Sequence, residues 1–215
     1  MNIVFKQFKI ATIILLVFTF ITGVVYPWII TEIAQYFFPN QANGSFIIQN
    51  GKNLGSTLIG QNFNSPKYFW GRPSATSIFP YNAMSSKGSD LSPVNPDFIA
   101  IVNKRVEILQ KAHGTNHKIP IDLVEASGSG IDPHISLAAA YYQIHRVAKA
   151  RGLTDEKVQK LVDAYVEDRQ FWILGEPRVN VLKLNLALDS LLHSSLNRVS
   201  QENTQNYNGP QKSDQ

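Results

Sequence analysis

The chain has 215 residues, of which 44% are hydrophobic and 17% are charged, so it has room for one domain of ordinary size beside an anchor and a tail. Its net charge of +4 is not gathered in a run of like charges, and we therefore expect no DNA or RNA partner. Cysteine is absent, which excludes disulfides, thiolate metal sites and a cysteine nucleophile.

Residues 10–30 form an uncharged apolar segment that predicts a transmembrane helix. As a helix the segment would rise about 32 Å, enough to cross a hydrocarbon core of about 30 Å. A buried core helix and a cleaved signal peptide are the alternatives. The apolar run is longer than the usual hydrophobic region of a signal peptide, and no small-residue cleavage site precedes the bulky Tyr26-Pro27-Trp28. We therefore expect an uncleaved anchor.

Positive charges are distributed unevenly about this segment. Lys6 and Lys9 precede it, whereas no Lys or Arg follows it before Lys52. The positive-inside rule then places residues 1–9 in the cytoplasm and the rest of the chain outside.

Three small or polar residues, Thr12, Thr19 and Gly23, give the predicted helix a narrow face that suits packing against other transmembrane helices. Thr is also common in contact with lipid. We predict these three residues as partner contacts.

The rest of the chain predicts one soluble mixed α/β domain over residues 31–192, so that the fold class is α+β with a single N-terminal transmembrane helix. Short apolar runs at 46–49 and 54–59, joined through Asn50-Gly51, predict a β-hairpin. Residues 62–96 are rich in Pro, Gly, Ser and Asn with interleaved aromatics, which predicts long ordered loops.

Capping residues and apolar spacing predict three helices. The first begins after Asn95 and ends at Gly114. The second begins after Asp132-Pro133 and continues to about Ala150, and the third begins at Thr154.

Other parts of the domain give weaker patterns. Residues 119–124 alternate like a strand, whereas residues 179–188 fit a strand and a helix equally. The polar residues 193–215 are predicted to form a disordered tail.

The stretch Ser127, Gly128, Ser129 and Gly130 directly precedes the second predicted helix. Free amides at a helix N-terminus attract phosphate, so this stretch is a candidate phosphate- or nucleotide-binding turn. It lacks the Gly-Lys-Ser/Thr sequence of a P-loop, and Asp132 would place a carboxylate where phosphate would sit. A tight turn with a structural role is the alternative.

Polar and aromatic residues in the loops, together with one histidine, are candidates for partner contact. Their alternative role is to hold the loops by bonding backbone groups. The predicted contacts are Trp70, Arg72, Asp90, Asp132, His134, Glu176 and Arg178. We predict no catalytic residue.

The five histidines are not spaced for a metal site. Gly114 interrupts the predicted helix between His113 and His117, and His134 and His145 would be about 16 Å apart along a helix. We predict no metal.

Five motifs in series are recognisable: YPW at 26–28, FWGRPSAT at 69–76, GSDLSP at 88–93, SGSGIDPHIS at 127–136 and LGEPRVNVL at 174–182. In order and spacing, the chain closely resembles the C subunit of the bacterial Kdp-type potassium-transporting ATPase over roughly residues 5–190.

The resemblance implies an accessory subunit of a high-affinity, ATP-driven potassium importer in the bacterial inner membrane. Its partners would be a channel-like K+-binding subunit, a P-type ATPase catalytic subunit, a small hydrophobic subunit and membrane lipid. Members of this family are described as catalytic chaperones that raise the affinity of the pump subunit for ATP. The chain has neither the Asp-Lys-Thr-Gly phosphorylation motif nor a Thr-Val-Gly-Tyr-Gly filter, so we predict an accessory subunit that is not itself an enzyme and that meets ATP only through the complex.

Two other functions stay open. One is a membrane-anchored solute-binding or assembly factor that acts independently of a pump. The other is a tethered hydrolase that uses Ser127 or Ser129 with His134 as base, for which the sequence gives no third orienting residue.

Overall fold

A computed structural model describes residues 2–49, 51–114 and 118–191. The chain divides between Ser56 and Thr57 into two compact units, which are described separately.

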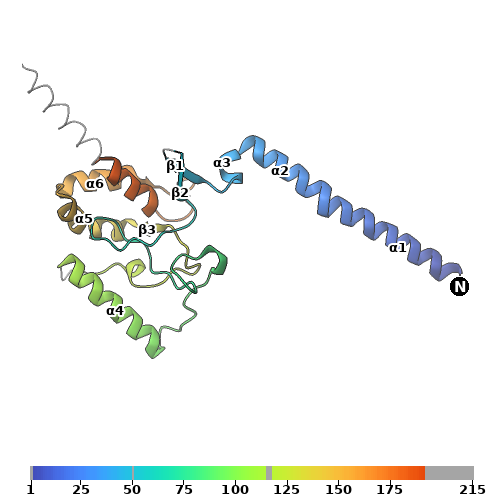
Figure 1. The fold of residues 1–215 in the computed structure, drawn as a ribbon. Coiled ribbons are helices and arrows are strands. Elements are labelled where there is room, and N and C mark those ends of the chain that lie inside the picture. Colours follow the sequence, from blue (N-terminus) through green and yellow to red (C-terminus); the bar gives the residue numbers. More distant parts are fainter. Residues whose placement is uncertain (1, 50, 115–117, 192–215) are drawn as a thin grey trace, which may run out of the picture. The chain divides into compact units, whose positions relative to one another are not determined.

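The first unit begins with one continuous helix made of α1 (Asn2–Phe20), a π-helical turn η1 (Ile21–Val25) and α2 (Tyr26–Phe37) (Figure 1). Among the described residues, Ile3–Phe37 is the one helix long and apolar enough to cross a membrane, and none of its most apolar part is buried. The helical backbone therefore extends beyond the predicted segment 10–30 at both ends.

The π-helical turn lies directly before Pro27, which is near the start of α2. Proline has no N–H, and its ring clashes with the carbonyl four residues earlier in an α-helix. Widening the turn avoids this clash, and the Tyr26 N–H donates to the Ile21 carbonyl, five residues back. The turn contains Gly23, one of the predicted partner contacts.

A short helix α3 (Pro39–Ala42) and a β-hairpin complete the first unit. Strands β1 (Phe46–Gln49) and β2 (Lys52–Ser56) are antiparallel, with a bulge between Ile47 and Ile48. The predicted hairpin is confirmed, but its second strand lies at Lys52–Ser56 rather than 54–59. Gly51 has a φ of 73°, and Asn50 lies outside the described residues.

The second unit packs helices against a small sheet. Residues 57–95 form long loops with one 3-10 turn, η2 (Ala83–Ser85), as predicted. Helix α4 (Pro96–His113) follows, capped by the Asn95 side chain and ended by Gly114 in the left-handed conformation. This predicted helix is confirmed at both ends.

The next predicted elements are partly wrong. Residues 119–124 are not a strand but contain a 3-10 turn, η3 (Ile121–Leu123). The second helix does not begin after Asp132-Pro133: that segment leads into strand β3 (His134–Ser136), and α5 (Leu137–Arg151) begins one element later with Ser136 as its cap. His134 and His145 therefore do not share a helix.

The chain closes with α6 (Asp155–Ala164), strands β4 (Val166–Glu167) and β5 (Arg178–Asn180), and helical residues 181–191. The N-cap of α6 is Thr154, as predicted. Both predicted alternatives occur within the segment 179–188: residues 179–180 end strand β5, and residues 181–188 are helical. The predicted tail 193–215 lies outside the described residues.

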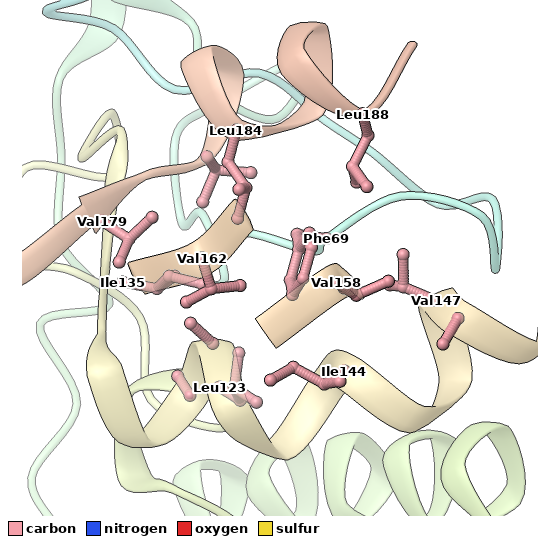
Figure 2. Close-up of a cluster of buried hydrophobic side chains, with 14 of the residues drawn as sticks. Phe69, Leu123, Ile135, Ile144, Val147, Val158, Val162, Val179, Leu184 and Leu188 are labelled. Carbon is pink, nitrogen blue, oxygen red and sulfur yellow. The ribbon is translucent and has the colours of Figure 1, made fainter. Parts of the chain in front are cut away.

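The sheet has the order β3-β5-β4, and both pairings are antiparallel. His134 is opposite Asn180, and Ser136 is opposite Arg178. Helices α5, α6 and 181–191 enclose the core. Phe69, which belongs to the long loop, lies in this core, and side chains from all three helices point toward it (Figure 2). Figure 2 labels its main members: Phe69, Leu123, Ile135, Ile144, Val147, Val158, Val162, Val179, Leu184 and Leu188.

Candidate functional site

Two buried amide side chains hold the long loop in place. Asn185 accepts from the Phe69 N–H at 2.8 Å and donates to the Phe69 carbonyl at 3.0 Å. Gln143 does the same for Trp70, at 2.8 and 3.1 Å. These paired bonds replace the partners that a strand would give, so the extended backbone is buried without a sheet.

Fixing Phe69 and Trp70 places Arg72 at the mouth of a polar pocket of about 310 Å³, which we call the charged pocket. It is lined by Arg72, Asp122, Asp132, His134, Ile135, Ser136, Glu176, Pro177 and Arg178. Five of the predicted contact residues converge there from three separate stretches of the sequence: Arg72, Asp132, His134, Glu176 and Arg178.

A chain of ionisable side chains begins in this pocket and continues to Glu167 and Lys183, which are not among the residues that line it. Asp132 lies 3.3 Å from the Arg72 Nη1 and 3.5 Å from the His134 Nδ1. On the other side of the imidazole, the His134 Nε2 lies 3.4 Å from Glu167. Glu167 also meets Arg178 at 3.4 Å and Lys183 at 2.8 Å. His134 thus bridges two carboxylates, each of which has a cation of its own.

Both carboxylates remain ionised at neutral pH. Burial alone would raise the pKa of Asp132, but hydrogen bonds from His134 and the charge of Arg72 outweigh it and hold the pKa below its ordinary value. Burial likewise opposes ionisation of Glu167, and the hydrogen bond and charge of Lys183 are the main causes that lower its pKa. The pocket is a set of fixed, paired charges that suits recognition of a polar surface.

One polar atom beside the pocket is unpaired. The Nε of Arg72 is buried and has no hydrogen-bond partner among the described residues. A buried donor without a partner is costly, and because this nitrogen has almost no accessible surface it is not presented to a group in the pocket.

Glu167 contacts three of these side chains, His134, Arg178 and Lys183, but it was not identified from the sequence. It lies in a two-residue strand with no motif around it, and its position opposite Arg178 follows only from the pairing of β4 with β5.

Trp70 and Asp90 lie apart from the charged pocket. Trp70 is half-buried, and its ring lies under the guanidinium of Arg146. Asp90 is exposed and pairs with Lys87 at 3.5 Å. Trp70 therefore holds the loop from within, which is the alternative role that the sequence left open for these residues.

The three helix residues belong to the first unit. Thr12 and Thr19 lie in α1 and Gly23 lies in η1. The Thr12 hydroxyl donates to the Phe8 carbonyl at 2.9 Å, a bond within the helix.

The turn at 127–130 does not precede a helix, which removes the physical basis of the predicted phosphate site. Within the turn, the Ser127 N–H donates to the Pro73 carbonyl and the Gly130 N–H donates to the Ser127 hydroxyl. The Ile131 N–H, directly after the turn, donates to the Ser129 hydroxyl. Gly128 is exposed at the surface of the turn. The turn thus lacks a following helix, and phosphate binding at residues 127–130 stays a prediction.

Gly130 shows why this turn needs glycine. Its φ is +68°, and a Cβ at this position would lie 2.4 Å from the Lys87 carbonyl oxygen. The Lys87 N–H in turn donates to the Ser129 carbonyl at 2.9 Å, so the turn is joined to the loop 86–88 by close backbone contact.

The described residues contain neither the serine and histidine arrangement that a hydrolase of this kind needs nor a cluster of metal ligands. Ser127 is 3% exposed, and its hydroxyl accepts a backbone N–H, whereas His134 is held between Asp132 and Glu167. No group of three or more His, Asp or Glu side chains among the described residues could hold a metal ion. His113 is buried, and His117 lies outside the described residues.

Comparison with known proteins gives a consistent result. The family model KdpC, described as K+-transporting ATPase, c chain, matches residues 8–190. A potassium-transporting ATPase KdpC subunit of Methylococcus capsulatus is 57% identical over 187 residues, which cover 86% of this chain and 98% of the relative. Subunits of the same name from Geobacter metallireducens and Herpetosiphon aurantiacus are 56% and 53% identical, over 86% of this chain and 98% and 96% of theirs.

Proposed function

Because the chain belongs to the KdpC family, the c chain of K+-transporting ATPases, we propose that it is a non-catalytic accessory subunit that braces the outer face of an ATP-driven K+ uptake complex. The observation that carries this proposal is the match over residues 8–190, which includes both the apolar helix and the folded domain with its charged pocket.

The apolar helix supports a location in the bacterial inner membrane. Lys6 and Lys9 lie in the first turns of this helix, before its uncharged segment 10–30, so the positive-inside rule favours a cytoplasmic N-terminus and a periplasmic domain. The small-residue positions Thr12, Thr19 and Gly23 would face neighbouring helices of the complex.

The domain would act as a brace over the channel-like K+-binding subunit. Its charged pocket contains the ion pair of Arg72 with Asp132 rather than a nucleophile with a base, which suits recognition of another protein. The catalytic P-type subunit and the small hydrophobic subunit would complete the assembly.

Any effect on ATP affinity would be indirect in this arrangement. A periplasmic domain cannot touch cytoplasmic nucleotide, so the influence would reach the pump subunit as a coupling free energy through membrane helices. The turn at 127–130 leads into strand β3 rather than into a helix, so it does not supply the helix N-terminus on which direct nucleotide contact was predicted.

Cysteine labelling tests the orientation cleanly, because the natural chain has no cysteine. Gln159→Cys places a thiol on an exposed position of α6, and Gln7→Cys places one near the exposed N-terminus. With a membrane-impermeant reagent on intact, outer-membrane-permeabilised cells, we expect labelling at position 159 and protection at position 7 until lysis.

The reverse pattern would overturn the proposed orientation and would make direct contact with ATP the leading hypothesis. If both positions are protected, labelling of the denatured protein distinguishes burial in the complex from a failure of the reagent.

A further inference from the structure

The second unit has an apolar loop that its own fold does not use. Residues 170–174 connect β4 to β5, and we call them the Phe-Trp loop. Phe171, Trp172, Ile173 and Leu174 are 81%, 86%, 74% and 55% exposed. Four consecutive large apolar side chains in solvent are unusual for a folded domain and mark an interaction site.

The loop has a defined conformation. Gln170 and Leu174 form an antiparallel bridge with two backbone hydrogen bonds of 2.8 and 2.9 Å. At its base, Arg169 donates to both carboxylate oxygens of Glu176, at 2.9 and 2.7 Å. Both bonds come from the same nitrogen, Nη2, and both side chains are largely exposed, so the pair closes the base of the loop but contributes little stability.

The backbone at the tip is strained. Phe171 and Trp172 have φ values of +53° and +67°, in the left-handed region that glycine occupies without penalty. The aromatic side chains contribute nothing to the domain core at this position, so the fold gives no reason to keep them. Strain held in place together with exposed aromatic residues is a feature of binding sites.

We propose that the Phe-Trp loop is a preformed plug that inserts into an apolar pocket on another protein subunit of the complex. This inference rests on the proposed function and deepens it, because it assigns the contact to particular side chains. The aromatic residues fill the pocket, and the ordered backbone lowers the entropy cost of binding.

A protein pocket fits this loop better than a lipid surface does. The residues beside the loop show no excess of positive charge: the three carboxylates of Glu167, Asp168 and Glu176 are matched by three cations, Arg169, Arg178 and Lys183, the last of which bonds Glu167 at 2.8 Å. Loops and helices that bind anionic bilayers carry an excess of Lys and Arg instead. Insertion into lipid also needs no fixed tip conformation, whereas a shaped pocket does.

The plug is also continuous with the charged pocket. Glu176, at the base of the loop, lines the pocket together with Arg178 and Arg72. An apolar centre beside paired charges is the usual composition of a protein interface.

Photocrosslinking in the intact complex tests the contact. A photoreactive phenylalanine analogue replaces Trp172, and in a parallel variant it replaces Ile99, which is 48% exposed on α4 and does not line the charged pocket. After illumination of membranes that contain all subunits, mass spectrometry identifies what is attached. We expect an adduct to one partner subunit from position 172 and none to that subunit from position 99.

Each other result is decisive. A lipid adduct from position 172, or no adduct although the chain copurifies with its partners, overturns the plug and leaves the proposed function intact. If the chain does not copurify with any ATPase subunit, both fail.

Trp172→Gly and Ile78→Gly form a matched pair of variants. Ile78 is 94% exposed and has a φ of +73°, so both changes relieve a strained backbone at an exposed position. We expect the purified full-length chain to be as stable as the parent or more so in both cases. Dissociation of the complex should be about tenfold faster or more for Trp172→Gly alone. Equal dissociation rates for the two variants would overturn the proposal.

Discussion

The guanidinium of Arg146 lies over the ring of Trp70, with its central carbon 4.1 Å from the ring centre. Arg146 is 6% exposed, and its nitrogens donate to the carbonyls of Pro66 and Tyr68 and to the Gln143 side chain at 2.7 Å. One side chain on α5 therefore satisfies several backbone groups of the long loop that leads to the charged pocket. Burial lowers the pKa of Arg146 to about 10, and it remains protonated at neutral pH.

Arg146→Met should destabilise the fold by about 2–4 kcal/mol, because it keeps much of the volume but leaves the loop carbonyls buried and unpaired. Urea unfolding of the full-length chain in detergent measures the change. The control is Arg169→Met, whose exposed ion pair with Glu176 should contribute less than about 1 kcal/mol. Equal losses in the two variants would contradict the role assigned to Arg146.

The buried position of His113 predicts that the fold becomes less stable at acidic pH. Its Nδ1 meets the Leu109 carbonyl at 2.8 Å and its Nε2 accepts from the Arg146 Nε at 3.1 Å, an arrangement that suits the neutral ring. Burial, with the charge of Arg146 as a further cause, lowers the pKa of His113 from 6.5 to about 4. The unfolded chain therefore binds the proton more readily, and stability should fall as the pH drops from about 6.5 toward 4.

Unfolding measured between pH 7 and 4 checks this expectation, with a slope on the order of 1 kcal/mol per pH unit in that window. His113→Phe should be less stable at neutral pH but should lose this slope. The lowered pKa values of Asp132 and Glu167 act in the same direction, but only below the ordinary range of carboxyl groups, so they do not account for a transition near pH 6.

The two glycines of the 127–130 turn should respond differently to alanine. Gly130→Ala places a methyl group against the Lys87 carbonyl at a φ of +68°, whereas a Cβ on Gly128 meets nothing within 4 Å. We expect a loss of about 1–3 kcal/mol for Gly130→Ala and a change within about 0.5 kcal/mol for Gly128→Ala. Thermal or chemical unfolding of both variants decides whether this turn is structural.

If the charged pocket meets a partner, the exposed cation at its edge should affect assembly. Arg178→Gln removes a half-exposed guanidinium from the pocket, and the matched Lys157→Gln removes an exposed amine from α6. The complex should dissociate at lower salt concentration with Arg178→Gln than with Lys157→Gln. Identical salt profiles would show that the pocket does not face a partner.

Local chemistry was enough to predict the helices whose ends are determined by one or two residues. Asn95 and Thr154 each accept an amide of the turn that follows, and Gly114 and Gly152 each adopt the left-handed conformation that ends a helix. None of these features depends on a distant part of the chain, so the sequence alone reveals them.

Predictions failed where distant pairing decides the structure. The Asp132 carboxylate accepts the His134 N–H at 3.0 Å, much as a helix cap would, but the chain then continues as a strand because β5 pairs with it. The same pairing explains the double nature of 179–188, whose first residues belong to the sheet and whose later residues are helical.

In the candidate site, too, some residues could be predicted from the sequence and others could not. The sequence drew attention to Arg72, Asp132 and His134 through their unusual surroundings, and the structure brings them to one pocket. Glu167 and the exposed Phe-Trp loop escaped notice, because an acid in a short strand and an apolar run of four residues both look ordinary until exposure and neighbours are known.

The π-helical turn η1 has a consequence for how the anchor can be surrounded. Each residue of an α-helix turns the chain by about 100°, so the residue accommodated by a π-helical turn rotates everything after it by about that angle. The edge that carries Thr12 and Thr19 is therefore not continued in line by α2. The two parts of this helix, α1 and α2, therefore present corresponding side chains in different directions, so that a neighbour packed along one part is not in line with a neighbour packed along the other.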